Sequence, residues 1–98
     1  MIVGSEVKKG DIVSAVGLLG EVVGRFVEET DTEVVLKSGR VFVPSQGESQ
    51  GGFVASVGMT CRQDLNEVRL NKSLIFTVVP THEVIEKGWI QAESGIVV

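Results

Sequence analysis

Two runs of β-branched residues separated by a short polar break constrain this chain more than any other feature. Residues 20–43 read GEVVGRFVEETDTEVVLKSGRVFV, and apolar and polar positions alternate around the acidic break EETDTE. Alternation on both sides of turn-forming residues predicts a β-hairpin. Ser38 and Gly39 give a second turn signal, so residues 34–43 are expected to form either one irregular strand or a strand and a short extension. The chain leaves the sheet at Pro44, which has no backbone N–H to donate. The chain is therefore expected to form a β-meander.

The composition favours an all-β fold. Valine dominates the apolar set, and β-branched side chains lose rotamer freedom on a helix. The 12 glycines among 98 residues suit short strands joined by many turns. A chain of this length forms one domain, 1–98, near the lower end of comfortable independent stability, so oligomerisation is a natural source of extra stability.

Further strands are expected on both sides of the hairpin. The first strand is expected within residues 11–19. It precedes the strand at 22–27, which is the first arm of the hairpin and in which Gly24 indicates the bend or bulge that closing a small barrel requires. Residues 68–79 form a second apolar block, read as a fourth strand with a turn or a kink near its start. Residues 83–86 are expected to form a short fifth strand after the turn signal Pro-Thr-His.

Three segments are expected to lie outside this sheet. Residues 45–67 are polar and glycine-rich without periodicity, which predicts a long loop insertion. Residues 88–98 are read as a C-terminal tail with one large anchor, Trp89. Residues 6–10 fit either one short helical turn or an extended lead-in.

The charge and the apolar runs exclude several classes of function. A net charge of −4 does not attract nucleic acid as a whole, so such binding needs a local basic patch or an oligomeric pore. No apolar run approaches membrane-spanning length, and the N-terminus lacks the order of a signal peptide, so a cytoplasmic protein without a membrane partner is expected. Cys61 is the only cysteine, which leaves no intrachain disulfide.

No catalytic, cofactor or metal site is predicted. His82 and Glu83 match the start of a zinc-binding HExxH helix, but the second histidine is absent and His82 is the only histidine in the chain. One histidine and scattered serines do not make a nucleophile and base pair. The chain is therefore expected not to be an enzyme.

Residues 11–36, DIVSAVGLLGEVVGRFVEETDTEVVL, resemble the first signature of the Sm-like small β-barrel family. Four residues lie at or within one residue of the glycine and apolar positions of that signature: Gly20, Gly24, Phe26 and Leu36. Residues 74–85, LIFTVVPTHEVI, resemble the second signature in outline, although VPTH at 79–82 replaces the family's usual Arg-Gly or Lys-His turn. The long glycine-rich insertion is similar to that of Sm-like proteins of phage origin.

The resemblance implies a small, five-stranded, strongly bent open barrel, Sm-like or SH3-like, that assembles as a homo-oligomeric ring of five to seven subunits. Such rings join the fourth strand of one subunit to the fifth strand of the next. The subunit interface implied here comprises Leu74, Ile75, Phe76, Val78, Val84 and Ile85. An apolar strand of this kind is too hydrophobic to remain a solvated edge, which also favours a closed ring.

The resemblance also implies binding of single-stranded RNA by two turns. This chain offers Asp31 and Thr32 in the turn before the third strand, and Thr81 and His82 in the turn after the fourth. Arg40 is added because a ring turns one arginine per subunit into a circle of positive charge.

Three functions stay open at this point. The first is a non-enzymatic RNA-binding or RNA-chaperone-like ring. The second is a structural or protein-interaction ring, such as a phage assembly or scaffold component, which the three acids of the turn at 29–33 favour because they repel phosphate. The third is an isolated SH3-like protein-binding module. A phage-encoded protein would act in the host cytoplasm.

Overall fold

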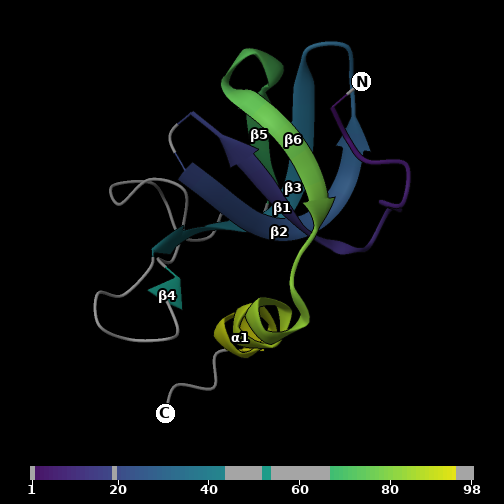
Figure 1. Ribbon diagram of the computed structural model, residues 1–98. Coiled ribbons are helices and arrows are strands. Elements are labelled where there is room, and N and C mark those ends of the chain that lie inside the picture. Colours follow the sequence, from purple (N-terminus) through teal and green to yellow (C-terminus); the bar gives the residue numbers. More distant parts are fainter. Residues whose placement is uncertain (1, 19, 44–51, 54–66, 95–98) are drawn as a thin grey trace.

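The chain folds into one bent antiparallel sheet followed by a single helix, as the computed structural model shows for residues 2–18, 20–43, 52–53 and 67–94 (Figure 1). The elements are β1 (Ile12–Gly17), β2 (Gly20–Glu29), β3 (Glu33–Val43), β4 (Gly52–Phe53), β5 (Glu67–Asn71), the 3₁₀ turn η1 (Lys72–Leu74), β6 (Ile75–Pro80) and α1 (Glu83–Ser94). The strand order is β4-β3-β2-β1-β6, and β5 pairs with β3. The predicted small, open, all-β architecture is confirmed.

The hairpin predicted within residues 20–43 forms β2 and β3. The bend predicted at Gly24 is confirmed, because the β2–β3 register shifts there. A Cβ atom at Gly24 would lie 3.1 Å from the Cα atom of Gly39, so a side chain there would require the neighbouring strand to move by a few tenths of an ångström. The turn signal at Ser38 and Gly39 produces no reversal of the chain, because β3 runs through both residues with Ser38 at a φ of 56°. Of the two arrangements expected for residues 34–43, one irregular strand is therefore the one that forms.

Of the turn or kink expected near the start of the apolar block at 68–79, the structure has the turn, which divides the block into β5 and β6. Asn71 ends β5, and its side-chain Oδ1 accepts the N–H of Ser73 at 2.8 Å, which caps η1. The chain then reverses, so that β5 pairs with β3 while β6 returns to β1. The fifth strand of the barrel is therefore β6.

The fifth strand predicted at residues 83–86 is wrong, because these residues open α1. The Nδ1 atom of His82 accepts the N–H of Val84 at 3.2 Å and caps the helix, and two glutamates in the first turn suit its positive end. Ile85 and Trp89 are four residues apart and pack on the sheet together. The predicted tail at 88–98 is likewise helical as far as Ser94.

Two groups of apolar side chains hold these parts together. The first fills the barrel and comprises Val13, Ala15, Val34, Leu36 and Val78. The second joins the sheet to α1 and comprises Ile12, Val23 and Trp89, with Phe42 and Ile85 packed against it. The helix is thus a cover for one face of the sheet.

The N-terminal segment lies along the outer edge of β6. Val3 bridges Val78 in a parallel arrangement, the N–H of Gly4 donates to the carbonyl of Val78 at 2.9 Å, and Val78 donates to the carbonyl of Ile2 at 3.0 Å. Residues 5–6 and 9–10 form turns, so the helical turn considered for residues 6–10 is absent from this described part of the chain.

Most of the predicted insertion at 45–67 lies outside the described residues; the exceptions are residues 52–53 and Glu67. Residues 52–53 form β4, which pairs with the end of β3, and Glu67 begins β5. No helix of the described chain is long and apolar enough to cross a membrane.

Candidate functional site

The residues predicted to contact RNA lie in separate parts of the barrel. Asp31 and Thr32 are exposed in the β2–β3 turn, where the carbonyl of Thr32 accepts the N–H of Lys72 next to the start of β6. Thr81 and His82 follow the other end of β6, in the connection to α1 (Figure 1). Within one subunit, the two predicted turns therefore do not form one site.

Three of these five residues use their side chains in structural contacts. Arg40 on β3 binds Glu93 of α1 through an Nε–Oε2 contact of 2.7 Å and also donates to the carbonyl of Ala92 at 3.4 Å. The Thr81 hydroxyl lies 2.8 Å from the Ser14 hydroxyl. His82 caps α1 as described above. Arg40 thus attaches α1 to the sheet, and its charge is balanced by a carboxylate.

A hollow between α1 and the sheet gathers two cations that the sequence did not single out. Its volume is about 370 Å³, and it is lined by Arg25, Lys37, Ser38, Trp89, Ile90 and Glu93. Arg25 on β2 and Lys37 on β3 are register partners, and both side chains are exposed. Like charges directly opposite each other on neighbouring strands are destabilising. The pairing of these two residues therefore calls for a functional explanation.

The other cations of the sheet are matched by carboxylates. Arg69 lies 3.1 Å from Glu33 and 3.7 Å from Glu67, and Lys72 lies 2.7 Å from Glu29. Arg25 and Lys37 form no ion pair within the described residues, although Lys37 is also the register partner of Glu67 on β5. The hollow beneath α1 is consequently the place on this part of the sheet where positive charge is left over.

The floor of the hollow is held by directed contacts. The Arg25 guanidinium lies 5.5 Å from the centroid of the Trp89 ring, and its Nη1 atom donates to the carbonyl of Gly10 at 2.7 Å. The indole Nε1 of Trp89 donates to the carbonyl of Ser38 at 3.1 Å. Ser38 has a φ of 56°, a left-handed conformation that costs a residue other than glycine about 1–3 kcal/mol and is concentrated at functional sites.

A second hollow lies next to the first one and shares Arg25 with it. Its volume is about 290 Å³, and it is lined by Gly10, Asp11, Ile12, Arg25, Pro80, Thr81, Glu86 and Ile90. Arg25 and Ile90 line both hollows, which together are here called the α1 groove. Thr81 is the one predicted RNA-binding residue that lines this groove, and two acids accompany it.

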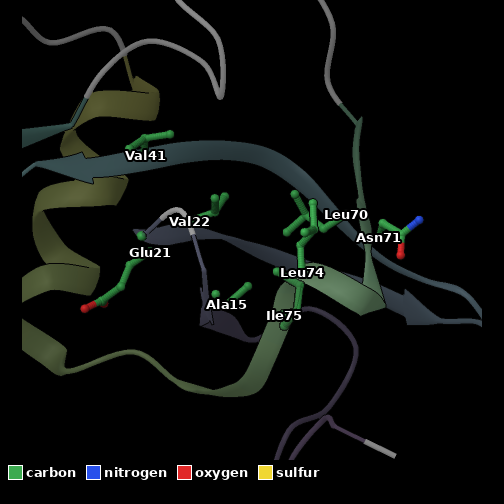
Figure 2. Close-up of a pocket in the computed structure, with 10 residues that line it drawn as sticks. Ala15, Glu21, Val22, Val41, Leu70, Asn71, Leu74 and Ile75 are labelled. Carbon is green, nitrogen blue, oxygen red and sulfur yellow. The ribbon is translucent and has the colours of Figure 1, made fainter.

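A third cavity, of about 280 Å³, opens at the mouth of the barrel and is largely apolar (Figure 2). It is lined by Ala15, Gly17, Gly20, Glu21, Val22, Val41, Leu70, Asn71, Leu74 and Ile75. Leu18 and Phe76 lie beside these residues in the chain and are 67% and 63% exposed, and Leu18 donates its N–H to the carbonyl of Leu74 at 2.9 Å. Of the residues that line the cavity, Leu74 is itself 43% exposed.

The six predicted interface residues fall into two groups. Val78 is fully buried in the barrel, while Ile75 and Ile85 are half-buried against the two cores. The exposed ones are Leu74, Phe76 and Val84. Val84 and Ile85 lie on α1, so they belong to no strand edge.

Glu29 is a buried charged group at the far end of β2. Its side chain is only 8% exposed, and its Oε2 atom accepts Lys72 Nζ at 2.7 Å and the N–H of Ile2 at 3.3 Å. Burial acts to raise the pKa of the Glu29 carboxyl, but Lys72 and the Ile2 N–H more than offset it, so the pKa lies below its ordinary value. Oε1 is buried without a hydrogen-bond partner among the described residues. Glu29 thus connects the N-terminal segment to η1.

The described residues contain no group of three or more His, Cys, Asp or Glu side chains placed to hold a metal ion. No protein-family model matches this chain, and no curated protein matches it either. The fold and its hollows define a class by structure alone: a small, open, all-β barrel with a C-terminal helix that forms one wall of a partly cationic groove.

Sequence reasoning missed Arg25 and Lys37 as a pair. Their separation of 12 positions along the hairpin shows only that they lie on neighbouring strands. Which residues face each other depends on the register shifts near Gly24 and between Phe26 and Glu28, which alternation does not reveal. The available signal was the glycine at position 24, which predicted the bulge without fixing its size.

Proposed function

We propose that the chain is a non-enzymatic, Sm-like ring subunit that binds single-stranded RNA. The strand order of the barrel is the observation that supports this most. β5 pairs only with β3, and β6 pairs only with β1 apart from the bridge to Val3, among the described residues. The edge of β5 and the part of the β6 edge that residues 2–4 leave uncovered allow β5 of one copy to pair with β6 of the next, and such a head-to-tail contact closes into a ring when its rotation permits.

The side chains at the start of β6 support this interface. Phe76 and Leu74 are 63% and 43% exposed, and an apolar strand edge left in water invites pairing with another chain. Residues 2–4 cover the middle of β6 at Val78. Pairing along the whole of β6 therefore requires the N-terminal segment to leave, whereas pairing at Phe76 does not.

The RNA half of the proposal is supported by the Arg25 and Lys37 pair. The chain has a net charge of −4, so attraction of phosphate depends on a local concentration of positive charge. A ring repeats the pair once per subunit, and the closely spaced cations then act together on one strand. This pair takes over the role predicted for Arg40, whose charge Glu93 balances.

The first test is the absolute mass in solution, measured by light scattering on a sizing column with and without a short uridine-rich RNA. The expected result is a defined multimer of five to seven copies that gains mass with RNA. A monomer at micromolar concentration would overturn the ring, and a multimer whose mass ignores RNA would overturn the RNA function.

A single substitution tests the interface. We expect Phe76→Glu to convert the multimer to smaller species, since it places a charge on the pairing edge. Val43→Glu is the matched control, because Val43 at the end of β3 is 47% exposed and takes the same change in charge. Equal masses for the Phe76 variant and the parent protein would exclude the β6 edge as the interface.

The apolar cavity favours a second function, a ring that binds protein and no RNA. Leu74 lines it and is 43% exposed, and Leu18 and Phe76 are also exposed apolar side chains of this part of the chain; exposed apolar surface marks protein contacts. Salt separates the two functions: RNA binding weakens steeply as salt is raised, whereas an apolar protein contact does not.

A further inference from the structure

The α1 groove combines an unbalanced pair of cations with a fixed framework. Arg25 and Lys37 face each other across β2 and β3, and both line the 370 Å³ hollow. An anion placed between them would remove the repulsion that their pairing creates. Glu93 lines the same hollow, but its carboxylate is held by Arg40 at 2.7 Å, so the hollow retains its positive character.

We infer that the phosphate groups of single-stranded RNA bind in this hollow, between Arg25 and Lys37, on the wall formed by α1. The inference rests on the proposed RNA-binding function and names its contact surface. It moves that surface from the β2–β3 and β6–α1 turns to the face beneath α1. Backbone contacts of this kind position a strand without reading its sequence.

Arg25 is prepared for such a contact. A guanidinium has five N–H donors, and the carbonyl of Gly10 accepts one of them at 2.7 Å. The Cζ atom of the same guanidinium lies 5.5 Å from the centroid of the Trp89 ring. Because the side chain is already held, little of its freedom is lost when a phosphate binds. Lys37 adds a point charge from the neighbouring strand.

The groove suits a polymer's phosphate better than a stacked base. Trp89 is only 3% exposed, so its face is not open to a base, whereas Ile90 is 47% exposed and gives the rim an apolar surface for a sugar. The second hollow of the groove, which shares Arg25 with the first, is lined by Thr81. Asp11 and Glu86 line that second part, so the phosphate sits at the Lys37 end.

The test is the affinity of a fluorescently labelled 12-nucleotide oligouridine, measured by anisotropy over a range of salt concentrations. Lys37→Glu is expected to lower the affinity by about tenfold or more, and Lys37→Gln is expected to reduce the slope of log affinity against log salt by about 0.7, the value for one phosphate contact to a single strand. Lys9→Glu is the matched control, because Lys9 is also exposed, takes the same charge change and lies outside both hollows. It should keep its affinity within about twofold.

Each outcome decides one question. Unchanged binding by both Lys37 variants, with circular dichroism confirming the fold, would overturn this surface while the proposed RNA function stands. Equal weakening by Lys37→Glu and Lys9→Glu would show that net charge governs binding and would also overturn the surface. No binding by the parent protein at low salt would overturn the proposed function itself. A change of Trp89 fluorescence with inorganic phosphate but not with oligouridine would assign the hollow to a small anion and overturn the RNA assignment.

Discussion

Removal of the Trp89 side chain tests how α1 is attached to the barrel. The indole is 3% exposed, packs with Ile12 and Val23, and donates to the carbonyl of Ser38 at 3.1 Å. Truncation of a buried tryptophan to alanine costs about 3–5 kcal/mol. A 12-residue helix is marginal in water by itself, so a helix that loses this anchor should also lose its helical structure.

The Trp89→Phe variant separates packing from hydrogen bonding. It keeps a buried ring but leaves the Ser38 carbonyl without its donor, which should cost about 1–3 kcal/mol in addition to the smaller ring. The measurement is urea unfolding followed by far-UV circular dichroism, with hydrogen exchange of the α1 amides as the local probe. Fluorescence does not serve here, because both variants lack the single tryptophan of the chain. We expect the α1 amides of Trp89→Ala to exchange much faster than those of β2 and β3. A loss of less than about 1 kcal/mol with full protection of α1 would refute the packing described here.

Two further predictions concern the barrel. A Cβ atom at Gly17 would lie 2.3 Å from the carbonyl oxygen of Leu74, so Gly17→Ala should lower the free energy of unfolding in urea by about 1–3 kcal/mol, and an unchanged midpoint would contradict this close approach. Glu29→Gln removes the partner of Lys72 and should cost about 2 kcal/mol at pH 7. Because the folded pKa of Glu29 is depressed, its contribution is present above its unfolded pKa of about 4.5 and is lost as the pH falls through the lower folded value. The parent protein should therefore lose stability below about pH 4.5 more steeply than Glu29→Gln, and parallel curves would contradict the assignment.

The strands could be predicted because their signals are local. Residues 22–27 and 34–36 alternate or cluster β-branched residues around a polar turn, and Gly24 marks the bend that the structure confirms. The fifth strand was misplaced because Val84 and Ile85 are β-branched, and four residues are too few to distinguish a strand from a helix. The helical signals lay in the spacing of Ile85 and Trp89 and in the capping position of His82, which are weaker than a β-branched pair.

The groove could not be predicted because it is a tertiary feature. Arg25 belongs to β2, Lys37 to β3 and Trp89 to α1, and only the docking of the helix brings the three together. Arg40 was chosen for a free positive charge, but its neutralising partner Glu93 is 53 residues away in the sequence. Long-range ion pairs of this kind leave no local pattern.

The dual position of α1 allows stability and binding to be separated. Trp89 belongs both to the core between helix and sheet and to the wall of the hollow, so Trp89→Ala should weaken the fold and RNA binding together. Lys37 is exposed and contributes to no core, so Lys37→Gln should weaken RNA binding while the urea midpoint stays within about 0.5 kcal/mol of the parent value. If the two variants lost RNA binding equally while Lys37→Gln also unfolded at lower urea, the loss would follow from the fold. Loss of binding by Lys37→Gln with an unchanged urea midpoint is the result that a phosphate contact alone explains. An exposed cation on β3 affects binding directly and changes the free energy of unfolding very little.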